Sequence, residues 1–253
     1  MFENQIIPIP VLPFGMVNAN LIRSKAGCVL IDAGIPGSER KIGKVLAQQG
    51  LTFRDIKLIV VTHAHTDHAG SAARLRDLSG APILAHQCDA DFYSRKEKMT
   101  YCSTGWVGKL FLRTPVPHQP YEGFIPDILM TNGDTLNLLD FGVDGIVRHT
   151  GGHTPGSIAV ELSSKDMMVG DLIASGILIG GMIFKGRAIR PPFEDDPATV
   201  SRELMRMVES GGKHFHMGHG GPLEAPEVLR HASTLAKLAR NPCASGECHH
   251  HKH

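Results

Sequence analysis

The sequence predicts a fold of the α+β class, because short apolar runs typical of β-strands occur alongside longer segments with the signals of α-helices. Two such runs, Leu58 to Val61 and Met167 to Val169, are too short for helices and are bounded by polar residues or glycine. The segment from Ser38 to Gln49 starts at a residue that can cap a helix, carries an apolar stripe and ends before a glycine. The chain is therefore expected to combine β-sheet with helices.

The first half of the chain is predicted to begin with a strand from Gln5 to Leu12. Pro8 and Pro10 have no N–H to donate to a neighbouring strand, so this strand is expected at the edge of a sheet. The next strands are expected at residues 20–23, 27–31 and 81–85, and a helix at residues 71–78. His86 follows the last of these strands, and we interpret it as an ordinary strand-end histidine.

The second half is predicted to return to strands and to end with two helices. The strands are expected at residues 134–139, 145–150, 160–162 and 167–169. Asp196 followed by Pro197 is typical of a helix start, because aspartate caps the first turn and proline needs no hydrogen-bond partner there. We expect this helix to reach Glu209 and the last helix to run from Pro226 to Arg240.

Residues 95–126 show no steady period and contain four prolines, so they are interpreted as an insert and a possible lid. The aromatic side chains of this insert, Trp106 and Phe111 among them, either line a substrate pocket or form a small core of the insert itself. Its basic residues Lys96, Lys98, Lys109 and Arg113 are expected to form a solvated face rather than an anion site. Residues 1–240 are predicted to form a single domain, and residues 241–253 a disordered tail rich in cysteine and histidine.

The chemistry is predicted to centre on residues 62–70, where three histidines and one aspartate fall within six positions directly after an apolar run. Histidine and aspartate suit zinc, manganese or iron. His63 and His65 are two residues apart, so in an extended segment they lie on the same side and can share one metal ion. Asp67 and His68 are then free to reach a second ion. The alternative is a polar surface loop that happens to be rich in histidine.

Three further ligand-type residues occur in matching contexts. His153, Asp171 and His219 each follow a strand-like run and are flanked by glycine, which lets the backbone approach an ion closely. One isolated histidine or aspartate is more often structural, but four segments repeat the same pattern. Seven residues can therefore form two sets of three, with one carboxylate left to bridge them.

The four motifs HxHxDH, GGHTPG, GD and GHGG together resemble the metallo-β-lactamase superfamily, from about Pro8 to Leu238. This resemblance implies a four-layer αββα sandwich with a dinuclear site, expected to hold two Zn²⁺, or Mn²⁺ or iron. It implies His63, His65 and His153 on one metal, Asp67, His68 and His219 on the other, and Asp171 on both. It also implies that Asp32, at a strand end, supports the metal loop, although a turn-forming aspartate is the simpler alternative.

The function that follows is a metal-dependent hydrolase in which a metal-bridging hydroxide attacks an ester, lactone, thioester or amide of a small molecule. Asp67 is the candidate to orient this hydroxide or to accept its proton.

A β-lactamase-like activity is an alternative, although β-lactamases of this superfamily usually place Cys or Ser where Asp171 stands. A mononuclear-iron oxidoreductase similar to persulfide dioxygenases is another, and a metal-stabilised binding protein without turnover is a third. Glyoxalase II shares these ligands but adds a long helical domain, and only 34 residues follow His219.

Composition sets the expected partners and location. The net charge of +1 disfavours a nucleic-acid-binding surface, and no apolar stretch reaches the roughly eighteen residues of a membrane span. The first residues lack the basic and apolar regions of a secretory signal, so a cytoplasmic location is expected. We expect a small-molecule substrate, no nucleic-acid or membrane partner, and a possible homodimer.

Overall fold

The computed structural model describes residues 4–176 and 183–239, and it contains two six-stranded sheets. The first sheet follows chain order and comprises β1 (Gln5–Pro10), β2 (Asn18–Arg23), β3 (Cys28–Ile31), β4 (Ile56–Val60), β5 (Ile83–His86) and β6 (Ile128–Met130). Strands β1 to β3 pair antiparallel, whereas β3 to β6 pair in parallel. The proline-rich β1 lies at the edge of this sheet, as the sequence predicts.

The second sheet is mixed and has the strand order β14-β13-β10-β9-β8-β7. Its strands are β7 (Thr135–Asn137), β8 (Gly145–His149), β9 (Ile158–Leu162), β10 (Asp166–Met168), β13 (His214–His216) and β14 (Leu223–Glu224). All pairs are antiparallel except β10 with β13. A separate two-stranded sheet pairs β11 (Ala174–Gly176) with β12 (Ile183–Ile189).

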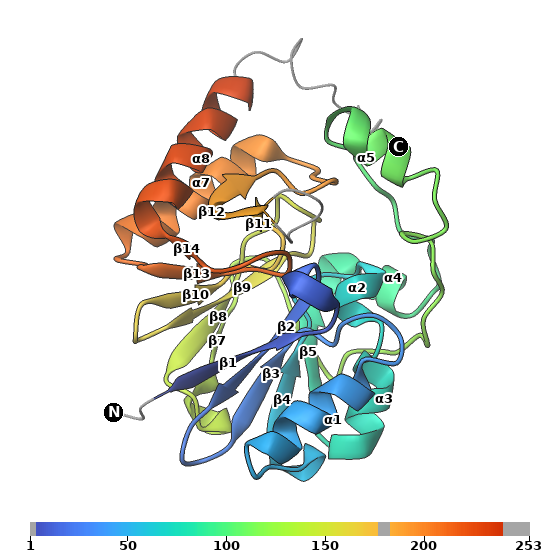
Figure 1. The fold of residues 1–253 in the computed structure, drawn as a ribbon. Coiled ribbons are helices and arrows are strands. Elements are labelled where there is room, and N and C mark those ends of the chain that lie inside the picture. The colour runs from blue at the N-terminus through green and yellow to red at the C-terminus, as the bar shows by residue number, and fades with distance from the viewer. Residues whose placement is uncertain (1–3, 177–182, 240–253) are drawn as a thin grey trace.

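Helices cover the outer face of each sheet, which gives the expected four layers (Figure 1). The helices of the first half are α1 (Glu39–Gln48), α2 (Thr66–Ala69), α3 (Ala72–Ser79), α4 (Ala90–Tyr93) and α5 (Gly105–Phe111). Helices α7 (Pro197–Glu209) and α8 (Ala225–Ala239) pack together on the second sheet. Short 3-10 turns lie at Pro13–Gly15, Phe53–Asp55, Gln87–Asp89 and Leu138–Phe141.

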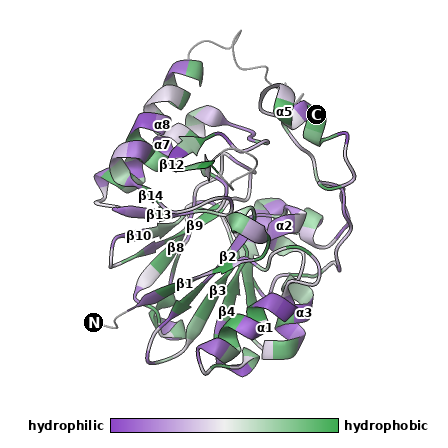
Figure 2. Ribbon diagram, viewed as in Figure 1, coloured by the Kyte–Doolittle hydropathy of each residue, from purple (hydrophilic) through white to green (hydrophobic). Residues whose placement is uncertain are grey.

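Three buried apolar clusters join the four layers, because successive side chains of a strand point to opposite faces. In β3, Leu30 packs toward α1, whereas Val29 and Ile31 pack between the two sheets. In β4, Ile59 likewise joins the helix-side cluster, whereas Leu58 and Val60 lie between the sheets. The third cluster joins the second sheet to α7 and α8. Figure 2 shows β3, β4 and β9 as largely hydrophobic, which agrees with strands buried on both faces.

The carboxyl ends of the parallel strands β3, β4 and β5 place three polar segments at one edge of the first sheet. Asp32 follows β3, the loop of His63 to His68 follows β4, and Asp89 follows β5. Parallel strands bring such segments together although they lie far apart in sequence. The fold therefore assembles a site at this edge from short segments that each follow a buried strand.

Most predicted helices agree with the structure within one or two residues, and α7 begins at Pro197 with Asp196 as its capping residue. The expected helix over 71–78 is α3, and the expected strand end at Val61 is β4 ending at Val60. Within the insert 95–126 the sequence showed no period, yet the structure contains the short helix α5 there. The predicted tail, residues 241–253, lies outside the described residues. Among the described residues, no helix has the length and apolar character that crossing a membrane requires.

Candidate metal centre

The first group of candidate ligands comprises His63, His65 and His153, whose ring nitrogens converge on one point. His63 Nε2 lies 3.0 Å from His65 Nδ1, and His153 Nε2 lies 3.2 Å and 3.1 Å from the same two atoms. These distances approach the edge of a coordination tetrahedron, about 3.3 Å for zinc–nitrogen bonds of about 2.0–2.1 Å. All three side chains are buried. We call this group the first set.

The second group comprises Asp67, His68 and His219, with Asp171 beside both groups. His219 Nε2 lies 3.3 Å from Asp67 Oδ2 and 3.0 Å from Asp171 Oδ2. His68 Nε2 lies 3.4 Å from Asp171 Oδ1, and His153 Nε2 of the first set lies 3.8 Å from Asp171 Oδ2. We call Asp67, His68 and His219 the second set. The position of Asp171 allows one carboxylate to serve both sets.

Neighbouring groups fix the orientation of the ligand side chains. Asp32 Oδ2 accepts a hydrogen bond from His68 Nδ1 at 2.8 Å, which turns Nε2 of that ring toward Asp171. Asp32 Oδ1 also accepts the backbone N–H of Thr62 at 2.8 Å and so holds the start of the metal loop. The geometry therefore agrees with a supporting role for Asp32. His219 is oriented similarly, since its Nδ1 donates to the backbone carbonyl of Met16.

Asp89 supports the first set in a way that sequence reasoning missed. Its side chain is fully buried and accepts hydrogen bonds from the backbone N–H of Ala64 at 3.1 Å and of Gly156 at 2.8 Å. The hydroxyl of Thr154 donates to the same carboxylate at 2.9 Å. Asp89 thereby ties the loop of His63 and His65 to the loop of His153. The only sequence signal was its place shortly after an apolar strand, which many surface aspartates share.

The histidines of the first set are held in the neutral form. Burial lowers the pKa of His63 and His65 well below the ordinary value of 6.5, and the neighbouring histidines lower it further. Burial also lowers the pKa of His153 to about 4. A neutral imidazole is the form that binds a metal ion. The first set therefore presents free lone pairs at neutral pH.

The histidines of the second set, unlike those of the first set, are held in the protonated form. Burial alone would lower the pKa of His219, but Asp171 and Asp67 outweigh it and raise that pKa to about 10. Burial also opposes the charged form of His68, yet Asp171, Asp32 and Asp67 together raise its pKa well above 6.5. Without a cation, both rings hold a proton and pair with carboxylates. The carboxyls of Asp67 and Asp171 stay ionised, because the neighbouring histidines lower the pKa of each below its usual range despite burial.

These donor sets fit divalent metal ions. The described residues contain two groups whose candidate ligand atoms lie within 4.8 Å of one another, His63, His65, His153 and Asp171 in one and Asp67, His68 and His219 in the other. Two buried atoms that face the centre, His68 Nε2 and Asp171 Oδ1, form an ion pair at 3.4 Å but make no well-aligned hydrogen bond within the described residues. A cation would satisfy them, and it would separate the ring nitrogens of the first set, whose lone pairs otherwise face one another.

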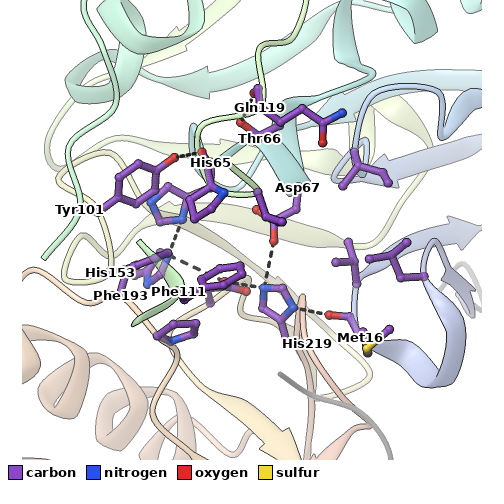
Figure 3. Close-up of a pocket in the computed structure, with 17 residues that line it drawn as sticks. Met16, His65, Thr66, Asp67, Tyr101, Phe111, Gln119, His153, Phe193 and His219 are labelled. Atoms are coloured by element: carbon purple, nitrogen blue, oxygen red, sulfur yellow. Dashed lines mark hydrogen bonds and ion pairs between the residues drawn. The ribbon is translucent and has the colours of Figure 1, made fainter. Parts of the chain in front are cut away.

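An apolar cavity of about 800 Å³, partly open to solvent, lies above these ligands. Figure 3 shows Tyr101, Phe111 and Phe193 lining it together with His65, Asp67, His153 and His219, and Asp171 belongs to the same lining. Its other walls come from Leu12, Met16, Val17, Ile35, Thr66, Val116, Pro117, Gln119 and Pro192. No lysine or arginine is among the described residues of this lining. The cavity therefore suits an apolar group bound next to the metal ligands.

The structure brings all seven predicted ligand residues together, from the four segments that the sequence indicated. Of the insert, Tyr101 and Phe111 line the cavity, whereas Trp106 is 75% exposed and is not part of the lining. His86 belongs to neither set; its ring stacks on that of His149, with centroids 3.9 Å apart. This placement agrees with its interpretation as a strand-end histidine.

Comparison with known proteins gives the class to which this arrangement belongs. A family model described as the metallo-beta-lactamase superfamily matches residues 12–223. The chain therefore belongs to the metallo-beta-lactamase superfamily. The family span includes all seven residues of the centre.

Individual relatives agree with a metal-dependent hydrolase. The probable metallo-hydrolase YqgX of Bacillus subtilis is 29% identical over 67% of this chain and 75% of its own length. The hydroxyacylglutathione hydrolase GloC of Haemophilus influenzae is 28% identical over 66% of this chain and 71% of its own length. A metallo-beta-lactamase family protein from Thermus thermophilus has a similar fold, with a TM-score of 0.65 and 22% identity over 94% of this chain and 79% of its own.

Proposed function

We propose that this chain is a dinuclear zinc hydrolase that cleaves an ester, thioester or lactone of a small molecule carrying an apolar group at the reacting carbonyl. The observation that carries the proposal is the pair of ligand sets joined by Asp171 beneath an apolar cavity. Two bound zinc ions would supply a water with its pKa lowered from about 15.7 to near 7 and a Lewis acid for the carbonyl oxygen. His63, His65 and His153 would hold one ion, and Asp67, His68 and His219 the other.

The residues of this chain position the reaction. Asp67 lines the cavity and pairs with His219 through Oδ2, so its carboxylate lies between the ligands and the substrate space. We assign it the role of orienting the attacking water and accepting its proton. Tyr101 and Phe193 face each other with ring centroids 4.7 Å apart and exclude water from the side of the cavity next to His65. A substrate carbonyl would enter over these rings toward the ligands.

The name of the Haemophilus relative, hydroxyacylglutathione hydrolase, favours including thioesters among the substrates to be tested. The seven ligands also favour two metals over the single iron of a persulfide dioxygenase. Among the described residues, the lining of the cavity contains no lysine or arginine that could anchor the carboxylate of a β-lactam.

Metal analysis and a substrate panel test the proposal. We expect about two zinc ions for each chain after reconstitution, and hydrolysis of at least one ester, thioester or lactone of an apolar acid. The panel includes a β-lactam, and oxygen uptake is measured with a glutathione persulfide. A replete protein that cleaves no ester, thioester or lactone yet consumes oxygen with the persulfide would overturn the hydrolase in favour of the oxidoreductase.

A further inference from the structure

A second hollow lies next to the apolar cavity above the ligands, which we call the metal-side cavity. Unlike that cavity, the second hollow is lined by basic side chains. It encloses about 750 Å³, and Thr66, Tyr101, Pro117 and Gln119 belong to the walls of both spaces. Its remaining lining comes from Phe92, Arg95, Lys98, Met99, His118 and Tyr121. Arg95 and Lys98 are cationic, and no carboxylate is among the described lining residues. We call this space the basic hollow.

The cations of the basic hollow have no carboxylate partner in the part of the chain that the structure describes. Among residues 4–176 and 183–239, no ion pair joins Arg95 or Lys98 to a carboxylate. Lys96, in contrast, lies 3.8 Å from Asp91 and outside the hollow. The expected solvated face of the insert is therefore divided, because Lys98 lines the hollow whereas Lys96, Lys109 and Arg113 do not.

Arg95 is held in place by its own backbone and by an aromatic ring. Its φ of +61° is a left-handed conformation that a side chain other than glycine adopts rarely, so the surrounding structure fixes it there. The guanidinium carbon lies 4.9 Å from the centre of the Tyr121 ring, within the range of a cation–π contact. The stem passes so close to Gly123 that a Cβ on that glycine would lie 2.7 Å from Arg95 Cγ. A side chain restrained in this way loses less entropy when it binds an anion.

The two spaces share a wall to which Thr66, Tyr101, Pro117 and Gln119 contribute. Two hydrogen bonds join these residues in pairs: Tyr101 Oη donates to the carbonyl of Pro117 at 2.5 Å, and Thr66 Oγ1 donates to the carbonyl of Gln119 at 3.0 Å. The same residues therefore present one face to the ligand sets and the other face to Arg95 and Lys98. Thr66 also directly precedes Asp67, so the wall stands beside the reacting centre.

We propose that the basic hollow binds a carboxylate or phosphate at the far end of the substrate, while the apolar part of that substrate occupies the metal-side cavity. This inference rests on the proposed hydrolase and narrows its substrates to anionic amphiphiles. Exposed cations hold a free anion weakly, since water and salt screen the attraction. An anion tethered to a group already bound in the cavity meets them at a high effective concentration. The basic hollow therefore selects for an anionic group on substrates that the metal-side cavity already holds, and it does not anchor a free anion by itself.

Matched substrates measure this preference. We use 4-nitrophenyl half esters of adipic, pimelic and suberic acid, each compared with its methyl-capped neutral counterpart, on zinc-replete full-length protein at low salt. We expect kcat/KM for the best anionic ester to exceed that of its neutral counterpart by roughly fivefold, the scale of one or two exposed ion pairs. The preference should shrink as salt is added.

Variants then locate the source of the preference. Arg95→Ala and Lys98→Ala should each lower kcat/KM for the anionic esters more than for the neutral esters, which moves the anionic-to-neutral ratio toward one, and Arg95→Glu should invert it. Arg40→Ala, which removes an exposed arginine from α1, should leave the ratio unchanged. Equal losses for both ester types in Arg95→Ala and Lys98→Ala, or no anionic preference in the wild type, would overturn the proposal.

A binding measurement separates this inference from the proposed hydrolase. Adipate is titrated calorimetrically into the wild type and into Arg95→Ala, which requires no turnover. If no ester is cleaved but adipate binds and Arg95→Ala weakens it, the basic hollow stands and the hydrolase fails. If esters are cleaved while adipate binds both proteins equally, the hydrolase stands and the basic hollow fails.

Discussion

The first and second ligand sets lie side by side around Asp171, yet they hold their histidines in opposite states. The ring nitrogens of His63, His65 and His153 face one another and are neutral, because burial lowers their pKa values. In the second set, His68 and His219 pair with carboxylates that raise their pKa values. The first set is therefore ready to bind a cation, whereas the second set has to release protons first.

This difference indicates how the apoprotein tolerates three carboxylates in a buried centre. Asp67, Asp171 and Asp32 would repel one another without compensation, and the two protonated rings supply it. A metal ion at the second set takes over that role as the protons leave. We infer that the first set fills before the second at neutral pH, since it competes with no protons.

Replacing Asp171 should have the largest effect, because this carboxylate lies between the two sets. We expect Asp171→Ala to lower kcat/KM by more than about a hundredfold, above the 10–100-fold typical of losing an outer partner. His153→Ala should lower it comparably by disrupting the first set. Most of the fold should remain, which circular dichroism and thermal unfolding would check. Near-normal activity in either variant would contradict the assignment of the ligands.

The pH dependence of zinc affinity should differ between the first and second sets, and this is the next largest effect we expect. His219→Ala leaves the first set and His153→Ala leaves the second, so zinc titration of each variant isolates one set. Between pH 6 and 8 the first set is already neutral, because its pKa values lie below this window. Its affinity should therefore change little.

In the same pH window both His68 and His219 are protonated, because the pKa of His68 is raised well above 6.5 and the pKa of His219 is about 10. Each proton displaced by zinc makes affinity rise by up to about tenfold for each pH unit. In His153→Ala, zinc affinity should therefore rise by up to about a hundredfold for each pH unit. Equal slopes in the two variants would show that the two sets do not differ in protonation.

Asp32→Asn should weaken the second set more than the first. The amide keeps the shape of the side chain and tolerates the φ of +63° at this position, but it removes the charge that faces His68 Nδ1. Loss of such a partner lowers metal affinity by about 10–100-fold. Zinc affinity in the His153→Ala background should fall by this factor. An equal fall in the His219→Ala background would show that Asp32 supports both sets.

The sequence predicted the centre better than its surroundings, because metal chemistry restricts residue type and spacing more than packing does. His63 and His65 lie two apart on an extended segment, and His153, Asp171 and His219 each follow a strand and adjoin glycine. The need for glycine is visible at Gly218, where a Cβ would overlap His68 and Asp171. The family resemblance implied the four layers, and β3 and β4 agree with it, since they contribute buried side chains both to the helix side and to the space between the sheets.

The insert and the hidden supports could not be predicted in the same way. Helix α5 has seven residues, of which Trp106, Val107 and Leu110 are at least half exposed, so its pattern shows no buried face. The division of Lys96 from Lys98 depends on which way the insert turns, and its sequence has no period to indicate that. Asp89 resembles any aspartate after a strand until the fold brings Ala64 and Gly156 to it.

Asp89→Asn tests the support of the first set and should have the smallest effect. Three donors point at this buried carboxylate, so an amide nitrogen in place of either oxygen faces at least one donor. We expect the free energy of unfolding to fall by about 1–3 kcal/mol, the cost of an unsatisfied buried donor. Zinc affinity of the first set should fall severalfold and that of the second set should not change.

Asp127→Asn is the matched control, because this carboxylate also accepts a backbone N–H, from Ile83 at 2.9 Å, but is 42% exposed. Water can satisfy the donor there, so Asp127→Asn should cost less; equal losses of stability would show that Asp89 is only one more loop aspartate.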